Sequence, residues 1–223
     1  MIEPIILAFQ RGGFWMWAIL VFQIISIVII VDRFLFLYRR RKDNQKEYAE
    51  KFAESICKGE LNSVIDQTKR DTTEHPIALA IQMGAQAAVD GGGREEIQGK
   101  MDEALIAETS LLDKRTSFLV MLGNVGTLTG LLGTIVGMIK AFSAVTYANP
   151  AEKATLLSSG VSEAMNTTAY GLVMAIPALF MFAVLQNRSN ELQEDLTQGA
   201  LKIFNLLSYK YQTVFEKKLE ASR

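Results

Sequence analysis

The chain has 223 residues, with 23 basic and 24 acidic side chains and a formal net charge of -1, and its pI is about 6.0. This balance argues against a nucleic-acid-binding protein held by overall positive charge. A single cysteine, Cys57, excludes a disulfide scaffold and any zinc or iron–sulfur site that needs several cysteines. The mean hydropathy of +0.17 is high for a chain with 21% charged residues, which indicates that charged and apolar residues occupy different segments.

Counting along the sequence shows this segregation. Residues 39–117 carry 28 of the 47 charged side chains, whereas residues 118–185 carry only four. A membrane-spanning helix needs about 20 mostly apolar residues, and three segments meet this requirement, at 14–31, 118–145 and 161–185. The helix of the first is expected to extend into the cytoplasm as far as residue 38. A helix buried in a soluble core is the alternative for each segment, but three of them in one short chain favour a membrane protein.

The first apolar segment has the length of a signal peptide but lacks its other features. A single basic residue, Arg11, precedes it, Trp15 and Trp17 lie at its start, and no cleavage site of small residues occurs before Asp32. Aromatic residues favour the membrane interface, whereas a signal peptide needs a basic start and a cleavage site. We therefore predict a retained membrane anchor.

Basic residues predict the orientation of the spans, because they are enriched in cytoplasmic loops. Five of them follow the first span: Arg33, Arg39, Arg40, Arg41 and Lys42. Only one precedes it, and only one lies between the second and third spans. We therefore expect the N-terminal segment 1–13 and the loop 146–160 outside the membrane, in the periplasm of a bacterium, and residues 39–117 and 186–223 in the cytoplasm.

The charged block is predicted to be helical, with turn signals at 71–76 and 90–93. From Arg94 no strong helix breaker precedes the second span, and the third span continues into the tail in the same way. The sequence therefore predicts an all-α integral membrane protein with three transmembrane helices, of which the second and third extend far into the cytoplasm.

Five apolar residues of the tail can form one stripe on a helix: Leu192, Leu196, Ile203, Leu206 and Leu207. This stripe packs either on the same chain or on another subunit. The only histidine, His75, precedes Pro76 in a predicted turn. For a lone histidine there we expect a structural or solvated role rather than metal binding.

The second span carries five glycines at spacings of three and four residues, which places them on one helix face: Gly123, Gly126, Gly130, Gly133 and Gly137. A glycine in a helix interior costs about 1 kcal/mol relative to alanine. Close approach of another membrane helix offsets that cost, so we predict tight packing along this stripe. The alternative is a sequence that lipid merely tolerates.

Small, partly polar faces occur on two consecutive spans. On the second, Thr127 and Thr134 lie seven residues apart beside the glycine stripe. On the third span a comparable small face is formed by Thr168, Gly171, Ala175 and Ala178, with Asn166 and Thr167 adjacent to it. A single threonine hydroxyl can simply bond to its own helix, but two such sets suggest a narrow polar path or a socket for a further helix.

Two charged residues lie near the outer ends of these spans, Lys140 on the second and Glu163 on the third. If both sit at one depth, Thr134 lies beside Thr168, and the two form a polar layer about 9 Å deeper at helical rise. Alternatively, Lys140 reaches the interface and Glu163 belongs to the loop. Pro177 removes one backbone hydrogen bond from the third span, which permits a hinge.

The segments GLLGTIVGMIKAF (130–142) and VSEAMNTTAYGLVMAIPAL (161–179) resemble the MotA/TolQ/ExbB proton-channel family, closest to its ExbB and TolQ branches. The resemblance extends to the topology of three spans; the flagellar MotA branch has an additional span and fits less well. It implies a homopentamer that encloses a dimer of a single-span ExbD/TolR-type partner, which supplies a membrane aspartate. Ion flow driven by the proton-motive force then performs mechanical work on a periplasmic or outer-membrane target.

The resemblance also implies roles for individual residues. Thr134 in GTIVG and Thr168 in TTAYG line the ion path and face the aspartate of the partner. Glu163 matches the glutamate at the start of the third span in the family, whereas Lys140 matches no position with an assigned role. From the residues themselves, the second and third spans contain no deep carboxylate, so a proton path needs a titratable group from elsewhere. Threonine hydroxyls can also coordinate sodium, and the coupling ion stays open between H⁺ and Na⁺.

Several functions stay open at this point. An ExbB-type motor energises TonB-dependent uptake, a TolQ-type motor works with a TolA-like protein on the envelope during division, and a third output is gliding motility. A passive membrane scaffold or a small solute transporter are alternatives of another class. We expect no cofactor and no enzyme, because the sequence lacks a nucleotide loop, a metal cluster and a nucleophile–base pair.

Overall fold

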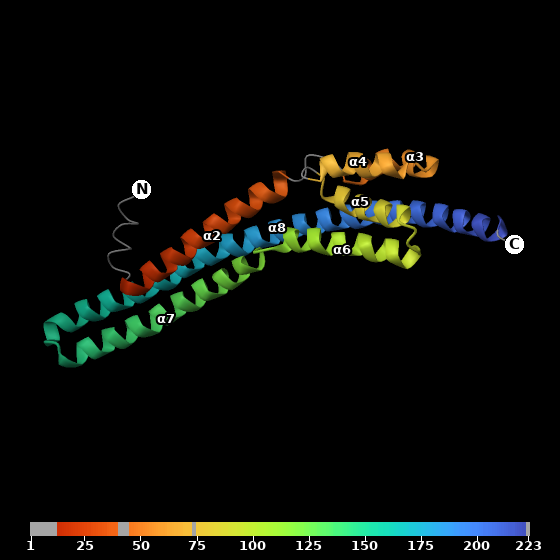
Figure 1. The fold of residues 1–223 in the computed structure, drawn as a ribbon. Helices are drawn as coiled ribbons and strands as arrows, with labels where there is room; N and C mark the ends of the chain where they lie inside the picture. The colour runs from red at the N-terminus through yellow and green to blue at the C-terminus, as the bar shows by residue number, and fades with distance from the viewer. Residues whose placement is uncertain (1–12, 40–44, 73–74, 222–223) are drawn as a thin grey trace. The chain divides into compact units, whose positions relative to one another are not determined.

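The structure, a computed structural model, describes residues 13–39, 45–72 and 75–221, and these residues are almost entirely helical (Figure 1). The helices are α2 (Gly13–Arg39), α3 (Gln45–Lys58), α4 (Leu61–Asp71), α5 (Pro76–Val89), α6 (Arg94–Asp113), α7 (Ser117–Tyr147) and α8 (Pro150–Ala221). Three stretches, in α2, α7 and α8, are long and apolar enough to cross a membrane. The predicted all-α fold with three spans is therefore confirmed. The segment 1–12 with Arg11, and Arg40 to Lys42 after the first span, lie outside the described residues.

The chain divides into two units, which we call the apolar unit (residues 1–34 and 115–186) and the charged unit (residues 35–114 and 187–223). In the apolar unit, α2 and α7 lie along the first part of α8 (Figure 1). Many of its large apolar side chains are exposed, among them Val28, Ile139 and Ile176 at 61%, 60% and 64%. Such a surface fits a lipid environment, because a soluble domain rarely exposes contiguous apolar patches of this size.

In the charged unit, each of α3, α4 and α5 packs against the helix that follows it, and α3 also packs against α5. The apolar stripe of the tail is buried within this unit: Leu192, Leu196, Ile203 and Leu207 are at most 4% exposed, and Leu206 is half-buried. A side chain at Gly199 would collide with Ile77 of α5. The stripe therefore packs on its own chain, which was one of the two possibilities that the sequence left.

His75 has the structural position expected for a lone histidine. It is 8% exposed, and its ring stacks on that of Tyr48 with centroids 3.9 Å apart and planes 14° from parallel. The Tyr48 hydroxyl donates a hydrogen bond to Asp71 Oδ2 at 2.9 Å. The stack and the hydrogen bond fasten α3 to the turn between α4 and α5.

The helix that enters the second span is interrupted, contrary to the prediction of an unbroken helix from Arg94. The helix α6 ends at Asp113 and α7 begins at Ser117. Between them Lys114 is extended, with φ -54° and ψ 129°, and Arg115 has a φ of +67°. The sequence contains no glycine or proline here to signal the break. The left-handed conformation, which glycine usually adopts, is instead occupied by Arg115. An ion pair between Arg115 and Asp32 Oδ2, at 3.6 Å, contributes to holding this conformation.

Candidate functional site

Two threonine hydroxyls meet where α7 and α8 cross in the apolar unit. The hydroxyl oxygens of Thr134 and Thr168 are hydrogen-bonded to each other, although the residues are 34 positions apart in sequence. Both side chains are half-buried. The stretches 117–139 and 164–187 around them contain no charged residue, so the two hydroxyls meet in a part of the membrane helices that carries no charge.

The glycines of α7 bring the two backbones close enough for this contact. A Cβ atom built on Gly130 would lie 3.2 Å from the Thr167 carbonyl oxygen and 3.3 Å from the Thr168 Cα. One built on Gly137 would lie 3.0 Å from the Ala164 Cβ. The other glycines of the stripe also face α8: Gly123 faces Leu179, Gly126 faces Met174 and Gly133 faces Thr167. From α8, Gly171 faces Gly126 and Gly130. The glycine stripe thus forms the α7–α8 interface.

The two hydroxyls have more acceptors within reach than protons to donate. Thr134 Oγ1 lies 3.2 Å from the Gly130 carbonyl oxygen and 3.3 Å from that of Ala164. Thr168 Oγ1 lies 3.0 Å from the Gly130 oxygen. Each hydroxyl has one proton and two lone pairs, so the pair can change its hydrogen-bond partners while the oxygens stay in place. A lone pair is then left to accept a hydrogen bond from water or from a protonated acid.

The other polar residues predicted near the path do not join this pair. The Thr127 hydroxyl donates to the Gly123 carbonyl at 3.0 Å, two turns from Thr134 on the same helix. Thr167 is 1% exposed and its hydroxyl donates to the Glu163 carbonyl at 2.9 Å, so it lies inside the helix interface. Asn166 is half-buried. Of these five residues, Thr134 and Thr168 are the two whose hydroxyls are hydrogen-bonded to each other.

The charges at the outer ends are offset from each other. Because Gly137 is opposite Ala164 and a side chain at Gly160 would meet Ala141, Lys140 lies level with residue 161 rather than with Glu163. The offset is two residues, or about 3 Å at helical rise. The antiparallel register predicted from the sequence is therefore off by two residues, but Thr134 still lies beside Thr168 as expected.

Glu163 has a different neighbour from the one expected, since its carboxylate lies against Gly13 at the start of α2. The N-terminus of a helix favours a negative charge because of its unpaired N–H groups and the helix dipole.

Lys140 is exposed. The helix α8 continues through Pro177, which is exposed.

One contact in the apolar unit was not predicted from the sequence. The Tyr170 hydroxyl of α8 donates a hydrogen bond to Gln23 Oε1 of α2. Gln23 is one of only two polar residues in the stretch 14–31, which was the available signal. Its partner could not be read from the sequence, because the two residues are 147 positions apart.

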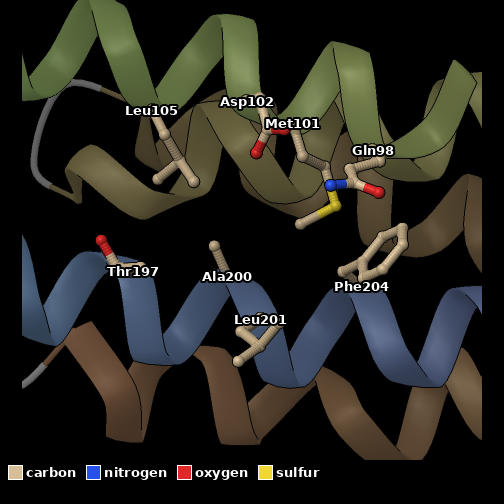
Figure 2. Close-up of a pocket in the computed structure, with 8 residues that line it drawn as sticks. All are labelled: Gln98, Met101, Asp102, Leu105, Thr197, Ala200, Leu201 and Phe204. Carbon is tan, nitrogen blue, oxygen red and sulfur yellow. The ribbon is translucent and has the colours of Figure 1, made fainter. Parts of the chain in front are cut away.

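A separate cavity of about 110 Å³ lies in the charged unit, between α6 and the tail of α8 (Figure 2). Its walls are mainly apolar, with Met101 and Leu105 on one side and Ala200 and Phe204 on the other. Among the described residues, no group of three or more histidine, cysteine, aspartate or glutamate side chains is placed to hold a metal ion. The polar residues that line the cavity are Gln98, Asp102 and Thr197.

Comparison with known families identifies the fold. The model of the MotA/TolQ/ExbB proton channel family matches residues 49–198, which is more than half of the chain and includes Thr134 and Thr168. This family consists of membrane channel subunits and not of enzymes.

Individual relatives come from the ExbB and TolQ branches. The Tol-Pal system protein TolQ of Haemophilus influenzae is 35% identical over 95 residues, 43% of this chain and 41% of the relative. The putative biopolymer transport protein ExbB-like 1 of Synechocystis is 26% identical over 183 residues, 79% of this chain and 68% of the relative. The biopolymer transport protein ExbB of Pseudomonas putida is 23% identical over 141 residues, 63% of this chain and 43% of the relative.

The similarity to these relatives is partial in length. This chain spans 41% and 43% of the TolQ and ExbB proteins just named, and 56% of a second ExbB-like protein of Synechocystis. The family match nevertheless covers the helices that carry the glycine stripe and the threonine pair. On these grounds, the chain is a multi-pass membrane protein that belongs to the MotA/TolQ/ExbB proton channel family.

Proposed function

We propose that this chain is the ExbB/TolQ-like subunit of an ion-driven motor in the bacterial inner membrane. In this proposal, the motor uses the proton-motive force to perform mechanical work on the envelope or on outer-membrane transport. The observation that carries the proposal is the hydrogen-bonded pair of Thr134 and Thr168, which lies in stretches of the two membrane helices, 117–139 and 164–187, that contain no carboxylate. A proton path along this pair requires an acidic group from a second protein.

The chemistry of the pair suits such an acid. An aspartate of an ExbD/TolR-type partner accepts hydrogen bonds when ionised and donates one when protonated. The two hydroxyls can serve both states, because they change from donors to acceptors without movement of their oxygens. A charged aspartate that is hydrogen-bonded is also less costly in a membrane than an isolated one. Thr127 and Asn166 extend the polar face in this proposal, whereas Thr167 serves the packing of the helices.

The assembly follows from the family resemblance. We propose a homopentamer that surrounds a partner dimer in its central pore, with the N-terminus in the periplasm and the C-terminus in the cytoplasm. The names of the relatives, which include both a Tol-Pal system protein and biopolymer transport proteins, leave two outputs: energising a TonB-like protein or working with a TolA-like protein. A gliding motor and a sodium-driven version are further variants of the same mechanism, and a passive scaffold is the remote alternative.

The test is to purify the chain together with a candidate ExbD/TolR-type partner and to measure proton flux into liposomes with a pH-sensitive dye. Thr134→Ala and Thr168→Val should each lower the flux about tenfold or more, which corresponds to 1.4 kcal/mol at the barrier. Thr129→Val is the matched control, because the Thr129 hydroxyl bonds to the Val125 carbonyl of its own helix at 2.7 Å. The control should conduct like the unaltered protein.

Two results would contradict the proposal. A stable complex that conducts no ions under any gradient would indicate a passive scaffold. Full flux in both threonine variants would exclude the pair from the path. Repeating the assay with a sodium gradient, and with a protonophore present, identifies the coupling ion.

A further inference from the structure

We propose that Gln23 of α2 and Tyr170 of α8 are positioning residues, whose hydrogen bond fixes the rotation of α8 so that Thr168 faces Thr134. This inference rests on the proposed function for the role of the threonine pair. It concerns a contact between the first and third spans that lies apart from the threonines themselves.

The contact is part of the packed interior of the apolar unit. The Tyr170 hydroxyl donates to Gln23 Oε1, and the Tyr170 ring packs against the buried cluster of Ile19, Leu122 and Met174. These three residues come from α2, α7 and α8. The tyrosine therefore has its ring in a core shared by all three spans and its polar end on α2.

The position of Tyr170 on α8 makes this contact sensitive to rotation. At 3.6 residues per turn each residue advances about 100° around the helix, so Thr168 and Tyr170 point in directions about 200° apart. One side of α8 therefore reaches α7 through Thr168, while nearly the opposite side reaches α2 through Tyr170. Any rotation of α8 that displaces Thr168 from Thr134 also breaks the contact with Gln23.

The surroundings favour keeping this hydrogen bond. Both side chains are half-buried among apolar residues of membrane helices, where an amide or a phenol without a partner is costly. Between α7 and α8 the directional contacts are those of the threonine pair itself, and the glycines around it pack closely but tolerate sliding and rotation better than interlocking side chains. The hydrogen bond between Gln23 and Tyr170 fixes the rotation of α8 about its axis.

Disulfide formation between Thr134→Cys and Thr168→Cys reports this rotation without any ion gradient or partner. The pair is introduced in a Cys57→Ser background, so that the two new thiols are the only ones in the chain. Tyr170→Phe should lower the rate of disulfide formation about threefold or more, as the average strength of a hydrogen bond between membrane helices predicts. Tyr147→Phe is the matched control, because Tyr147 is 92% exposed, and it should leave the rate unchanged.

The double variant Gln23→Leu/Tyr170→Phe separates positioning from stability. It removes both polar groups, so that none is left unpaired, and its thermal stability should recover relative to Tyr170→Phe. If the bond positions Thr168, the disulfide rate stays low despite that recovery. Two results overturn the proposal. One is a disulfide rate in the double variant equal to that of the protein that keeps Gln23 and Tyr170, and the other is an unchanged rate in Tyr170→Phe.

Proton flux with the partner then completes the test in the protein that keeps both threonines. Tyr170→Phe and the double variant should each lower the proton flux about threefold or more, and Tyr147→Phe should leave it unchanged. A complex that fails to conduct even without substitutions would contradict the proposed function, while the disulfide rates would still decide the positioning role.

Discussion

Gly130 of α7 and Gly171 of α8 face each other with no side chain between them. A Cβ atom built on Gly171 would lie 3.1 Å from the Gly130 Cα and 2.9 Å from the Gly126 carbonyl oxygen. This approach of backbone to backbone sets the distance between the two helices near the threonine pair. The hydrogen bond between Thr134 and Thr168 therefore depends on residues that have no side chains.

Gly171→Ala should destabilise the apolar unit, because the methyl group meets backbone atoms that cannot move aside. We expect the free energy of unfolding in detergent to fall by about 1–3 kcal/mol, the range for overpacking a closely packed site. Gly99→Ala in α6 is the control, since a Cβ there has no neighbour within 4 Å. It should be neutral or stabilise by up to about 1 kcal/mol, because alanine favours a helix interior. Equal effects of the two substitutions would contradict this account.

Gly13→Ala should weaken the start of α2. The φ of Gly13 is +66°, and a Cβ there would collide with the carboxylate of Glu163. Strain from a left-handed alanine is about 1–2 kcal/mol, and the collision adds to it. Glu163→Ala combined with Gly13→Ala should relieve the collision but not the backbone strain, so the double variant should melt above Gly13→Ala and below the unaltered protein. A melting temperature for the double variant below that of Gly13→Ala would argue that the carboxylate mainly stabilises the start of α2.

Arg115 offers a pair of substitutions that separates backbone strain from an ion pair. Arg115→Ala loses the contact with Asp32 and keeps a side chain at a φ of +67°. Arg115→Gly loses the same contact but removes the strain. The free energy of unfolding of the glycine variant should therefore exceed that of the alanine variant by about 1 kcal/mol. If alanine is the more stable of the two, the break between α6 and α7 is not held in the left-handed conformation.

The Tyr48 hydroxyl makes the charged unit sensitive to alkaline pH. Burial of Tyr48 raises its pKa above the ordinary value, and the hydrogen bond to Asp71 raises it further. An acid whose pKa is higher in the folded state contributes fully below its unfolded pKa, which is about 10 for tyrosine. That contribution is lost as pH rises toward the folded pKa, because the unfolded chain ionises first.

The variant Tyr48→Phe isolates this effect. Near pH 8 it should be less stable than the unaltered protein by about 1 kcal/mol, the net value of a hydrogen bond. Between pH 9 and 11, near the ordinary tyrosine pKa of about 10, the difference in unfolding free energy should shrink. Thermal unfolding followed by circular dichroism at each pH measures it. A difference that stays constant over this range would contradict a raised pKa for Tyr48.

Much of this protein was readable from its sequence. The three apolar segments predicted three spans, because a lipid environment requires long runs of apolar residues. The spacing of glycines predicted a close helix interface, and the motifs around Thr134 and Thr168 indicated the family and placed both threonines at one level. These features are local or periodic, so one stretch of sequence is enough to reveal them.

The tertiary structure decided what depends on contacts between distant residues. The break before α7 has no glycine or proline to signal it, and Arg115 in this break forms an ion pair with Asp32 of another helix. Gln23 finds its partner in Tyr170, and Glu163 lies at Gly13 rather than level with Lys140. Composition and periodicity predict which face of a helix is small or polar, but only the packing of three helices determines which residue each polar group meets.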